Sequence, residues 1–371
     1  MSHSQNPLSP LRRSRSAAGE RLEILDQTLL PWRKEWRPLT TLADAEHAIL
    51  TMQVRGAPLI GVIAAYGIAL GLQEHDDDAG VLNAISARLA ATRPTAVNLG
   101  WALTRVCEHL RALPELTGQQ RINAAWREAD AIAAEDADNN GAIGAHGLKL
   151  LQAIRNSHPD RPLQLMTHCN AGWLATAGHG TALAPIYAAH QAGLPVHVWV
   201  SETRPRNQGL LTAWELMEAG VPHTLMTDNA AGLLILQGRV DALIVGADRI
   251  AANGDVANKV GTCLKALAAA HQCLPFYVAA PSSTLDFNAA SGNDIPIETR
   301  SADELRFVAG VDRQHQASRL RQIDEGHSVY NPGFDITPAA LVTAIITEHG
   351  VIPAREPALA RLLRAQVSED R

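Results

Sequence analysis

The stretch VDALIVGADRIAANGDVANKVGT, residues 240–262, decides the fold. The apolar run at 242–245 is typical of a fully buried strand in a parallel sheet. Asp248 follows where that strand should end, and Asn258 and Lys259 come ten residues later, just before a helical segment. In open α/β sheets, ligands bind beyond the carboxyl ends of the strands. An acid, an amide and a cation in this order therefore suggest a small-molecule site.

The same residues also have a purely structural interpretation. Asp248 could cap a turn and Asn258 could cap the following helix, as side chains at such positions commonly do. This stretch alone leaves both interpretations open, and the rest of the chain has to separate them.

Apolar runs alternate with helical segments throughout the second half of the chain. The runs are LQLMTHC (163–169), VHVWVSE (196–202), HTLMTD (223–228), DALIVGAD (241–248) and PFYVAA (275–280). Such alternation predicts βαβ units and a parallel sheet. No GxGxxG follows the first run, so a dinucleotide site of the usual kind is not predicted.

The chain of 371 residues is long enough for two domains. We predict an α/β fold in which a Rossmann-like parallel sheet follows a smaller, mainly helical domain. The predicted segments are a disordered tail (1–19), a helical N-terminal domain (20–150), a Rossmann-like α/β catalytic domain (151–355) and a C-terminal tail (356–371). The pattern also predicts a break in the helices at 136–144 and a final helix over 336–350.

Composition excludes several classes of partner. The net charge of −6 gives no overall attraction to nucleic acid or to anionic membranes. The longest apolar run, residues 57–72, is interrupted by glycines and is short for a membrane span, and no signal peptide is visible. The four cysteines lack disulfide or zinc-finger spacing, which indicates a cytoplasmic protein without a metal.

Polar residues gather at the ends of consecutive predicted strands, and this favours the functional interpretation. These residues lie in THCNAG (167–172), SETRPRNQG (201–209), TDN (227–229) and GADR (246–249). One such junction is ordinary turn chemistry. Four in a row would direct cysteine, acid, arginine and glutamine side chains into one crevice.

Cys169 and His168 have different expected roles. Cys169 could be a buried small hydrophobe, but its place at a strand end before a helix favours a thiol with a lowered pKa and a chemical role. His168 alternates to the opposite face of the strand and is expected to be structural. Together with His179, these residues make no convincing zinc set.

Several arginines lie where an anion could bind. Arg204 and Arg206 flank Pro205 in a stiff loop, with Glu202 and Asp228 placed to orient them, although both could be plain surface charges.

The segments Arg55-Gly56-Ala57 and Arg93-Pro94 each place a cation before a helix. The start of a helix offers backbone N–H groups to an anion, so each segment could bind one. Either segment alone is more often a plain helix start.

The motifs taken together resemble the methylthioribose-1-phosphate isomerase family. They are RGAPLIG (55–61), RPTAVNLGWA (93–102), THCNAGWLAT (167–176), SETRPRNQG (201–209), TDNAAG (227–232), GADRIAANGDVANKVGT (246–262) and NPGFDITP (331–338). The family shares a superfamily with the regulatory subunits of the guanine-exchange factor for eukaryotic initiation factor two and with ribose-1,5-bisphosphate isomerase. The resemblance spans residues 25–350, and Gly333, where alanine is usual, is its one visible departure.

The resemblance implies specific roles for individual residues. Asp248 matches the family's proton donor and Cys169 its catalytic cysteine, acting as a base or as a transition-state stabiliser. The matching substrate-binding residues are Arg55, Gly56, Ala57, Arg93, Gln208, Asn258 and Lys259. The regulatory subunits generally lack the cysteine and aspartate pair, so this chain's motifs favour the enzyme.

The implied reaction converts 5-methylthioribose 1-phosphate to 5-methylthioribulose 1-phosphate in methionine salvage. The resemblance implies a homodimer that needs no cofactor and no metal. Two alternatives stay open from the sequence. One is an isomerase of another 1-phosphorylated pentose, such as ribose 1,5-bisphosphate or 5-deoxyribose 1-phosphate. The other is a non-catalytic protein of the same fold that senses a sugar phosphate or a nucleotide.

Overall fold

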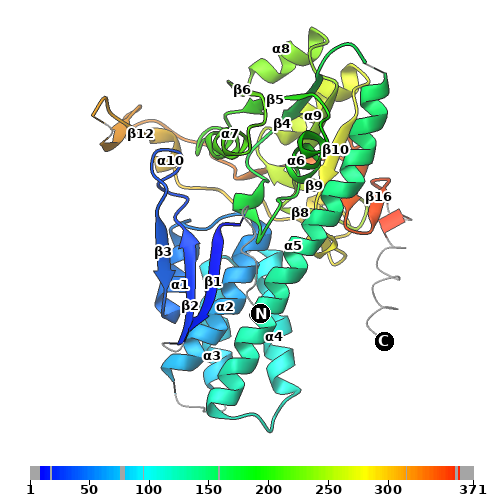
Figure 1. The fold of residues 1–371 in the computed structure, drawn as a ribbon. Coiled ribbons are helices and arrows are strands. Elements are labelled where there is room, and N and C mark those ends of the chain that lie inside the picture. The colour runs from blue at the N-terminus through cyan, green and yellow to red at the C-terminus, as the bar shows by residue number, and fades with distance from the viewer. Residues whose placement is uncertain are drawn as a thin grey trace.

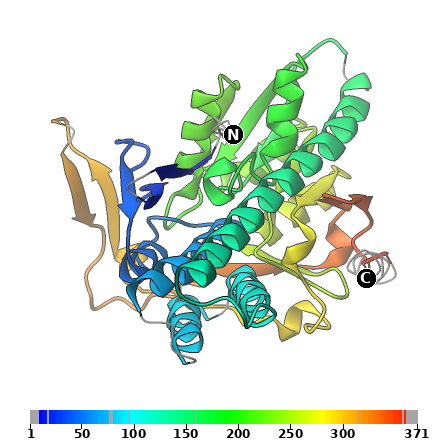
Figure 2. The same ribbon diagram turned by 60° about the horizontal axis from the view of Figure 1, so that its bottom comes forward.

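The computed structural model describes residues 9–16, 19–75, 80–94, 96–157, 159–314, 316–355 and 358–359. A layer of helices forms from the first part of the chain and a large, mostly parallel sheet from the second (Figure 1). The long helix α5 (Gly118–Asn156) packs first against α2 (Ala57–Glu74) and then against α6 (Ala184–Gln191), so it runs along both parts (Figure 2). The predicted mixed α/β class is confirmed.

A small antiparallel sheet near the N-terminus corrects the prediction of a disordered tail. Its strands pair in the order β1 (Leu11–Ser16), β2 (Gly19–Leu25) and β3 (Trp36–Leu39). Two arginines of β1 stack on aromatic rings, with Arg12 3.8 Å from the ring centroid of Trp36. Arg13 lies 4.2 Å from the centroid of Trp126. The prediction is wrong for residues 11–16, while residues 1–8 and 17–18 lie outside the described residues.

Helix α2 is the centre of the helical layer. The other helices there are α1 (Leu42–Leu50), α3 (Val81–Thr92), α4 (Val97–Arg111) and α5. Close contacts explain its glycines, because a Cβ on Gly61 would lie 2.7 Å from the Asn98 carbonyl oxygen. Among the described helices, α2 alone is long and apolar enough to cross a membrane, yet 78% of that stretch is buried against other elements. It is therefore a core helix in this fold.

Helix α5 runs without the break predicted at 136–144, so that prediction is wrong. Gly144 in this segment serves packing, because a Cβ there would lie 3.2 Å from the Ala184 carbonyl oxygen. A Cβ on Gly147 would lie only 2.3 Å from Pro185. Small residues thus let α6 approach α5 closely, and that contact offsets their low helix propensity.

The large sheet follows the order β16-β15-β10-β7-β4-β5-β6, parallel except at β16. Its strands are β4 (Leu163–Thr167), β5 (Val196–Ser201), β6 (His223–Met226), β7 (Ala242–Val245), β10 (Phe276–Ala279), β15 (Ala344–Thr347) and β16 (Gly350–Ile352). The chain runs outward from β4 to β6, then returns to the other side of β4 as β7. The strand order therefore reverses between β4 and β7, where α/β sheets place their ligands.

Alternating side chains divide the sheet between two cores. Leu165 and Ile244 pack with α5, α6 and α7 (Gln208–Glu218) on one face. Met166 and Leu243 pack with α8 (Ala230–Leu236) and α9 (Thr262–His271) on the other. Helices on both faces explain why the strands read as continuous apolar runs.

The segment after Asp248 forms a hairpin where the sequence predicted a loop. Strands β8 (Arg249–Ala251) and β9 (Val256–Lys259) pair antiparallel, and β14 (Phe334–Thr337) pairs with β9. Asn258 and Lys259 are consequently held by a strand, and not by the start of α9.

The helix predicted over 336–350 is wrong. This segment contains the end of β14, the short turn Ala339–Leu341, and β15, which pairs in parallel with β10. A fully apolar run such as 344–346 cannot be assigned to helix or strand by periodicity alone. The further elements are β11 (Leu285–Asp286), α10 (Asp303–Arg306), β12 (Phe307–Val311), β13 (Ala317–Arg321) and the short turns Trp173–Ala175, Ser282–Thr284 and Gly292–Asp294.

Candidate active site

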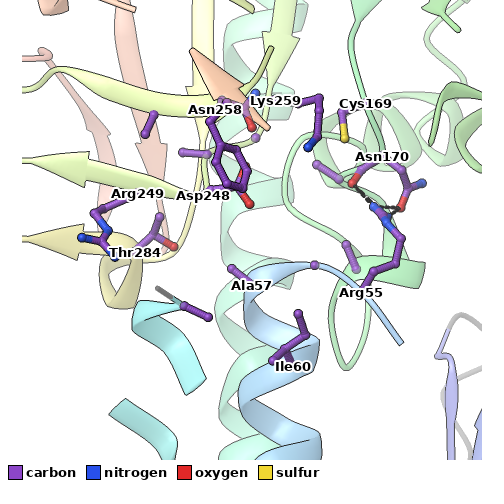
Figure 3. Close-up of a pocket in the computed structure, with 18 of the residues that line it drawn as sticks. Arg55, Ala57, Ile60, Cys169, Asn170, Asp248, Arg249, Asn258, Lys259 and Thr284 are labelled. Atoms are coloured by element: carbon purple, nitrogen blue, oxygen red, sulfur yellow. Dashed lines mark hydrogen bonds between the residues drawn. The ribbon is translucent and has the colours of Figure 1, made fainter. Parts of the chain in front are cut away.

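One pocket lies where the strand order reverses, between the sheet and the start of α2. Every residue that the sequence analysis selected for the site lines it: Arg55, Gly56, Ala57, Arg93, Cys169, Gln208, Asp248, Asn258 and Lys259. Figure 3 shows Cys169, Lys259 and Asp248 around this space, with Arg55 reaching to Asn170 and Ala57 at the start of α2. Residues far apart in sequence thus meet at one site.

Cys169 follows β4 in a left-handed conformation, with φ of 64°. Its N–H donates to Thr203 Oγ1 at 2.8 Å, and its carbonyl accepts from Thr212 Oγ1 at 2.7 Å. Burial raises the pKa of the Cys169 thiol, although Arg55 and Lys259 favour the thiolate. The expected lowered pKa is therefore wrong, and Cys169 is a thiol at neutral pH until a base or a ligand changes its surroundings.

Asp248 lies just after β7, and its N–H donates to the Ala257 carbonyl at 2.9 Å. Within the described part of the chain, no group donates a hydrogen bond to its carboxyl. Burial raises the pKa of Asp248 against the opposing effect of Lys259, Arg55 and Arg93. A carboxyl with a raised pKa retains its proton closer to neutrality, which suits an acid catalyst.

Gly56 brings Arg55 and the start of α2 close to the sheet. Its φ is 93°, and a Cβ there would lie 2.5 Å from both Cβ and the carbonyl oxygen of Ala175. Only glycine permits this approach. The Arg55 guanidinium donates to Asn170, with Nη1 2.6 Å from Oδ1 and Nη2 2.5 Å from the backbone oxygen.

We predict that Gly56→Ala destabilises the protein by about 2 kcal/mol or more, because it adds both a clash and an unfavourable φ. Gly100→Ala in α4 is the matched control, since its Cβ would meet nothing within 4 Å. That control should stabilise slightly through helix propensity. Thermal unfolding of both variants measures the difference, and a Gly56→Ala protein as stable as wild type would contradict this assignment.

Lys259 adds a cation to the pocket, and Asn258 and Gln208 add amide groups. Lys259 donates to the Gly333 carbonyl at 2.8 Å and lies 4.6 Å from the Phe334 ring centroid. Asn258 donates to Thr262 Oγ1 at 3.1 Å, and Gln208 is buried with no hydrogen-bond partner for Oε1 in the described structure.

Two predicted interpretations near the pocket have clear outcomes. His168, expected on the opposite face of the strand, also lines the pocket. Its ring is buried, with Nε2 2.9 Å from the Val260 carbonyl oxygen. Asp228 does not orient the guanidinium groups. It accepts the N–H groups of Thr203 and Arg204 and the Ser201 hydroxyl, and so holds the loop backbone.

Sequence reasoning missed Arg300, Glu298 and Glu215. Arg300 and Glu298 line the pocket, 2.8 Å apart, but belong to an irregular segment without a recognisable motif. Glu215 lies behind the pocket, fully buried and bonded to Asn170. Its place four residues after the buried Leu211, on the apolar stripe of α7, is the signal that could have revealed it.

Comparison with known proteins agrees with this geometry. Residues 53–354 match the model of the Initiation factor 2 subunit family. The methylthioribose-1-phosphate isomerase of Dechloromonas aromatica (strain RCB) is 60% identical over 341 residues, which cover 92% of this chain and 93% of the relative.

Two solved structures are also similar. One is 5-methylthioribose 1-phosphate isomerase from Pyrococcus horikoshii OT3, 35% identical, with a TM-score of 0.83 and coverage of 98% of this chain and 99% of that chain. The other is the translation initiation factor eIF-2B, subunit delta, from A. fulgidus, 37% identical, with a TM-score of 0.79 and coverage of 96% and 99%.

The fold and the matched residues define the class: the chain belongs to the Initiation factor 2 subunit family. Within it, the high identity over nearly the whole length places the chain among the methylthioribose-1-phosphate isomerases.

Proposed function

We propose that this protein is an aldose–ketose isomerase that converts 5-methylthioribose 1-phosphate to 5-methylthioribulose 1-phosphate in methionine salvage. The observation that carries the proposal is the pocket that Cys169, Asp248 and the predicted substrate-binding residues line together. The high identity to proteins named methylthioribose-1-phosphate isomerase supports the same conclusion.

The substrate explains the need for an acid. Phosphate on the anomeric oxygen prevents the spontaneous opening that a free aldose undergoes, so the ring oxygen must be protonated. In the proposal, Asp248 gives that proton, and burial supports this role by raising the pKa of its carboxyl. Arg55, Arg93 and Lys259 would bind the phosphate, since charge-assisted hydrogen bonds from cations hold such groups strongly.

Hydrogen then moves from C2 to C1 of the opened sugar. In an enediol route, a base removes the C2 proton, a proton is returned to C1, and the 2-hydroxyl loses its proton as the C2 carbonyl forms. In a hydride route, the C2 hydrogen moves with its electron pair while the 2-hydroxyl loses its proton. As the base in the first route Cys169 would have to react as its thiolate, which Arg55 and Lys259 favour against the effect of burial; alternatively, it would stabilise the charged intermediate in either route. Both routes balance within one substrate and need no external carrier.

A methylthio group on C5 is favoured over a second phosphate, because Arg206 and Arg300, the further arginines at the pocket, already pair with glutamates. Arg206 pairs with Glu304 at 3.1 Å. Arg300 pairs with Glu298 at 2.8 Å and with Glu304 at 2.9 Å. A 5-phosphate would have to compete with these carboxylates, whereas an apolar substituent would not.

Incubation of the purified protein with 5-methylthioribose 1-phosphate tests the proposal directly. We expect a ketose product, detected by NMR. Ligand-induced thermal stabilisation without any product would instead favour the sensing protein and overturn the enzyme.

We further propose the finer organisation that the family resemblance implies. A helical N-terminal domain at 20–150 would precede a Rossmann-like catalytic domain at 151–355, and the reversal of strand order between β4 and β7 supports the second. A cytoplasmic location is supported by four free cysteines. Most of the C-terminal tail at 356–371 lies outside the described residues.

The proposed homodimer would be formed through α8 and α9. These adjacent helices expose Leu233, Leu236, Leu264 and Leu267 by more than half, and a second copy of the chain would cover them.

Burying a leucine contributes about 1.5–3 kcal/mol, so we predict that the pair Leu233→Glu and Leu264→Glu converts a dimer to a monomer. Light scattering after gel filtration measures this, with Leu50→Glu on α1 as the control. A wild-type monomer would contradict the proposal, as would a doubly substituted dimer.

A further inference from the structure

Glu215 is a fully buried carboxyl behind the pocket that accepts four hydrogen bonds. Its Oε1 accepts from Asn170 Nδ2 at 2.7 Å and from the Leu174 N–H at 3.2 Å. Its Oε2 accepts from the Trp173 N–H at 2.8 Å and from the Tyr187 hydroxyl at 2.9 Å. Four donors stabilise the ionised carboxylate.

This carboxylate determines the orientation of the Asn170 amide. An ionised carboxylate can only accept hydrogen bonds, so the NH₂ group of Asn170 must face Glu215. The same NH₂ group donates to Thr212 Oγ1 at 3.1 Å. Asn170 Oδ1 therefore faces the opposite side, where it accepts from Nη1 and Nη2 of Arg55 at 2.6 and 2.8 Å.

The backbone around Glu215 fits it closely. A Cβ on Gly172 would lie 1.9 Å from Glu215 Oε2, and the turn Trp173–Ala175 begins with its N–H groups on the carboxylate. Ala175 at the end of this turn contacts Gly56, the neighbour of Arg55. Two independent routes thus connect Glu215 to Arg55, one through the Asn170 amide and one through the turn.

We propose that Glu215 is a positioning residue, which aims the Arg55 guanidinium at the substrate phosphate by fixing the Asn170 amide. That Arg55 binds the substrate phosphate rests on the proposed function, whereas the hydrogen bonds that link Glu215, Asn170 and Arg55 do not depend on it. Glu215 itself lines no part of the pocket among the described residues, so it acts through Asn170 and Arg55.

Glu215→Gln is the variant to test, because it preserves the size of the side chain. Its NH₂ group must face at least one of the four groups that donate hydrogen bonds to Glu215. The Asn170 amide can then reverse and turn its own NH₂ toward Arg55. Tyr187→Phe is the matched control, since it removes one hydrogen bond from the same carboxylate but none from Asn170. Asn170→Ala cuts the connection and leaves Glu215 its other donors, so it serves if Glu215→Gln fails to fold.

Binding of inorganic phosphate, measured by calorimetry at pH 8, is the first readout. This pH lies above the value of about 7 to which burial raises the pKa of Glu215. We expect Glu215→Gln and Asn170→Ala each to weaken phosphate binding about tenfold, the value of one hydrogen bond to a charged group. Tyr187→Phe should lower the melting temperature without changing phosphate affinity.

Coupling to Arg55 separates positioning from general destabilisation. In an Arg55→Ala background, adding Glu215→Gln should change phosphate affinity less than about twofold. An additive effect, or a Glu215→Gln protein that binds phosphate like wild type, would overturn the inference. So would a wild type that binds no phosphate, because Arg55 would then hold none.

Steady-state kinetics distinguish a failure of the role of Glu215 from a failure of the proposed function. With 5-methylthioribose 1-phosphate, Glu215→Gln should raise KM about tenfold and change kcat less. If the wild type fails to turn over this sugar, the proposed function fails, while the phosphate measurements still decide the role of Glu215.

Discussion

Asp248→Asn is expected to abolish turnover of 5-methylthioribose 1-phosphate, with a loss of about 10⁴-fold or more. The asparagine keeps the shape of the side chain but cannot protonate the ring oxygen, and the phosphorylated anomeric carbon leaves no other way to open the ring. Binding should be largely preserved, because the cations of the pocket are untouched. Steady-state kinetics and substrate calorimetry measure the two effects separately.

Asp160→Asn, at an exposed turn before β4, is the matched control and should be fully active. The wild-type pH profile gives a second check. Because burial raises the pKa of Asp248 and the acid works only when protonated, kcat/KM should fall as the pH rises through that pKa. Near-normal activity of Asp248→Asn would remove Asp248 from the mechanism.

Cys169→Ser is expected to lower kcat by about 10²-fold or more, the usual value of a well-placed acid or base. Serine replaces the sulfur with a smaller oxygen and disturbs packing little, so a large loss would report the chemistry of the thiol. Cys273→Ser is the matched control, because Cys273 is exposed and has a similar φ of 55°.

A Cys169→Ser enzyme within about tenfold of wild type would argue that the cysteine only fills space. Turnover in D₂O adds the mechanistic distinction. Deuterium at C1 of the product indicates the enediol route with proton exchange, whereas retention of the C2 hydrogen favours hydride transfer.

The sheet and the pocket could be predicted from the sequence because local signals agree there. Buried parallel strands such as 242–245 read as apolar runs, and side chains like Asp248 follow them at one edge. The strand ends locate the site at one edge of the sheet. That Arg55, in the helical part, joins Lys259 there could be predicted only from the family resemblance.

The errors arise where tertiary contacts override local patterns. The segment 136–144 is typical of a helix break, but its Gly144 allows α6 to approach α5. The run at 344–346 was assigned to a helix, since a short apolar run has no period that distinguishes it from a strand. The basic segment 11–16 looks solvated from sequence because nothing local reveals that Arg12 and Arg13 stack on tryptophans.

The most direct test of the central claim is kcat/KM of the purified protein for 5-methylthioribose 1-phosphate, beside ribose 1,5-bisphosphate and 5-deoxyribose 1-phosphate. We predict turnover with a clear preference for the methylthio sugar, because the additional arginines near the pocket are paired with carboxylates. A preference for the bisphosphate would contradict the assigned substrate, and no turnover of any of the three sugars would contradict the isomerase itself.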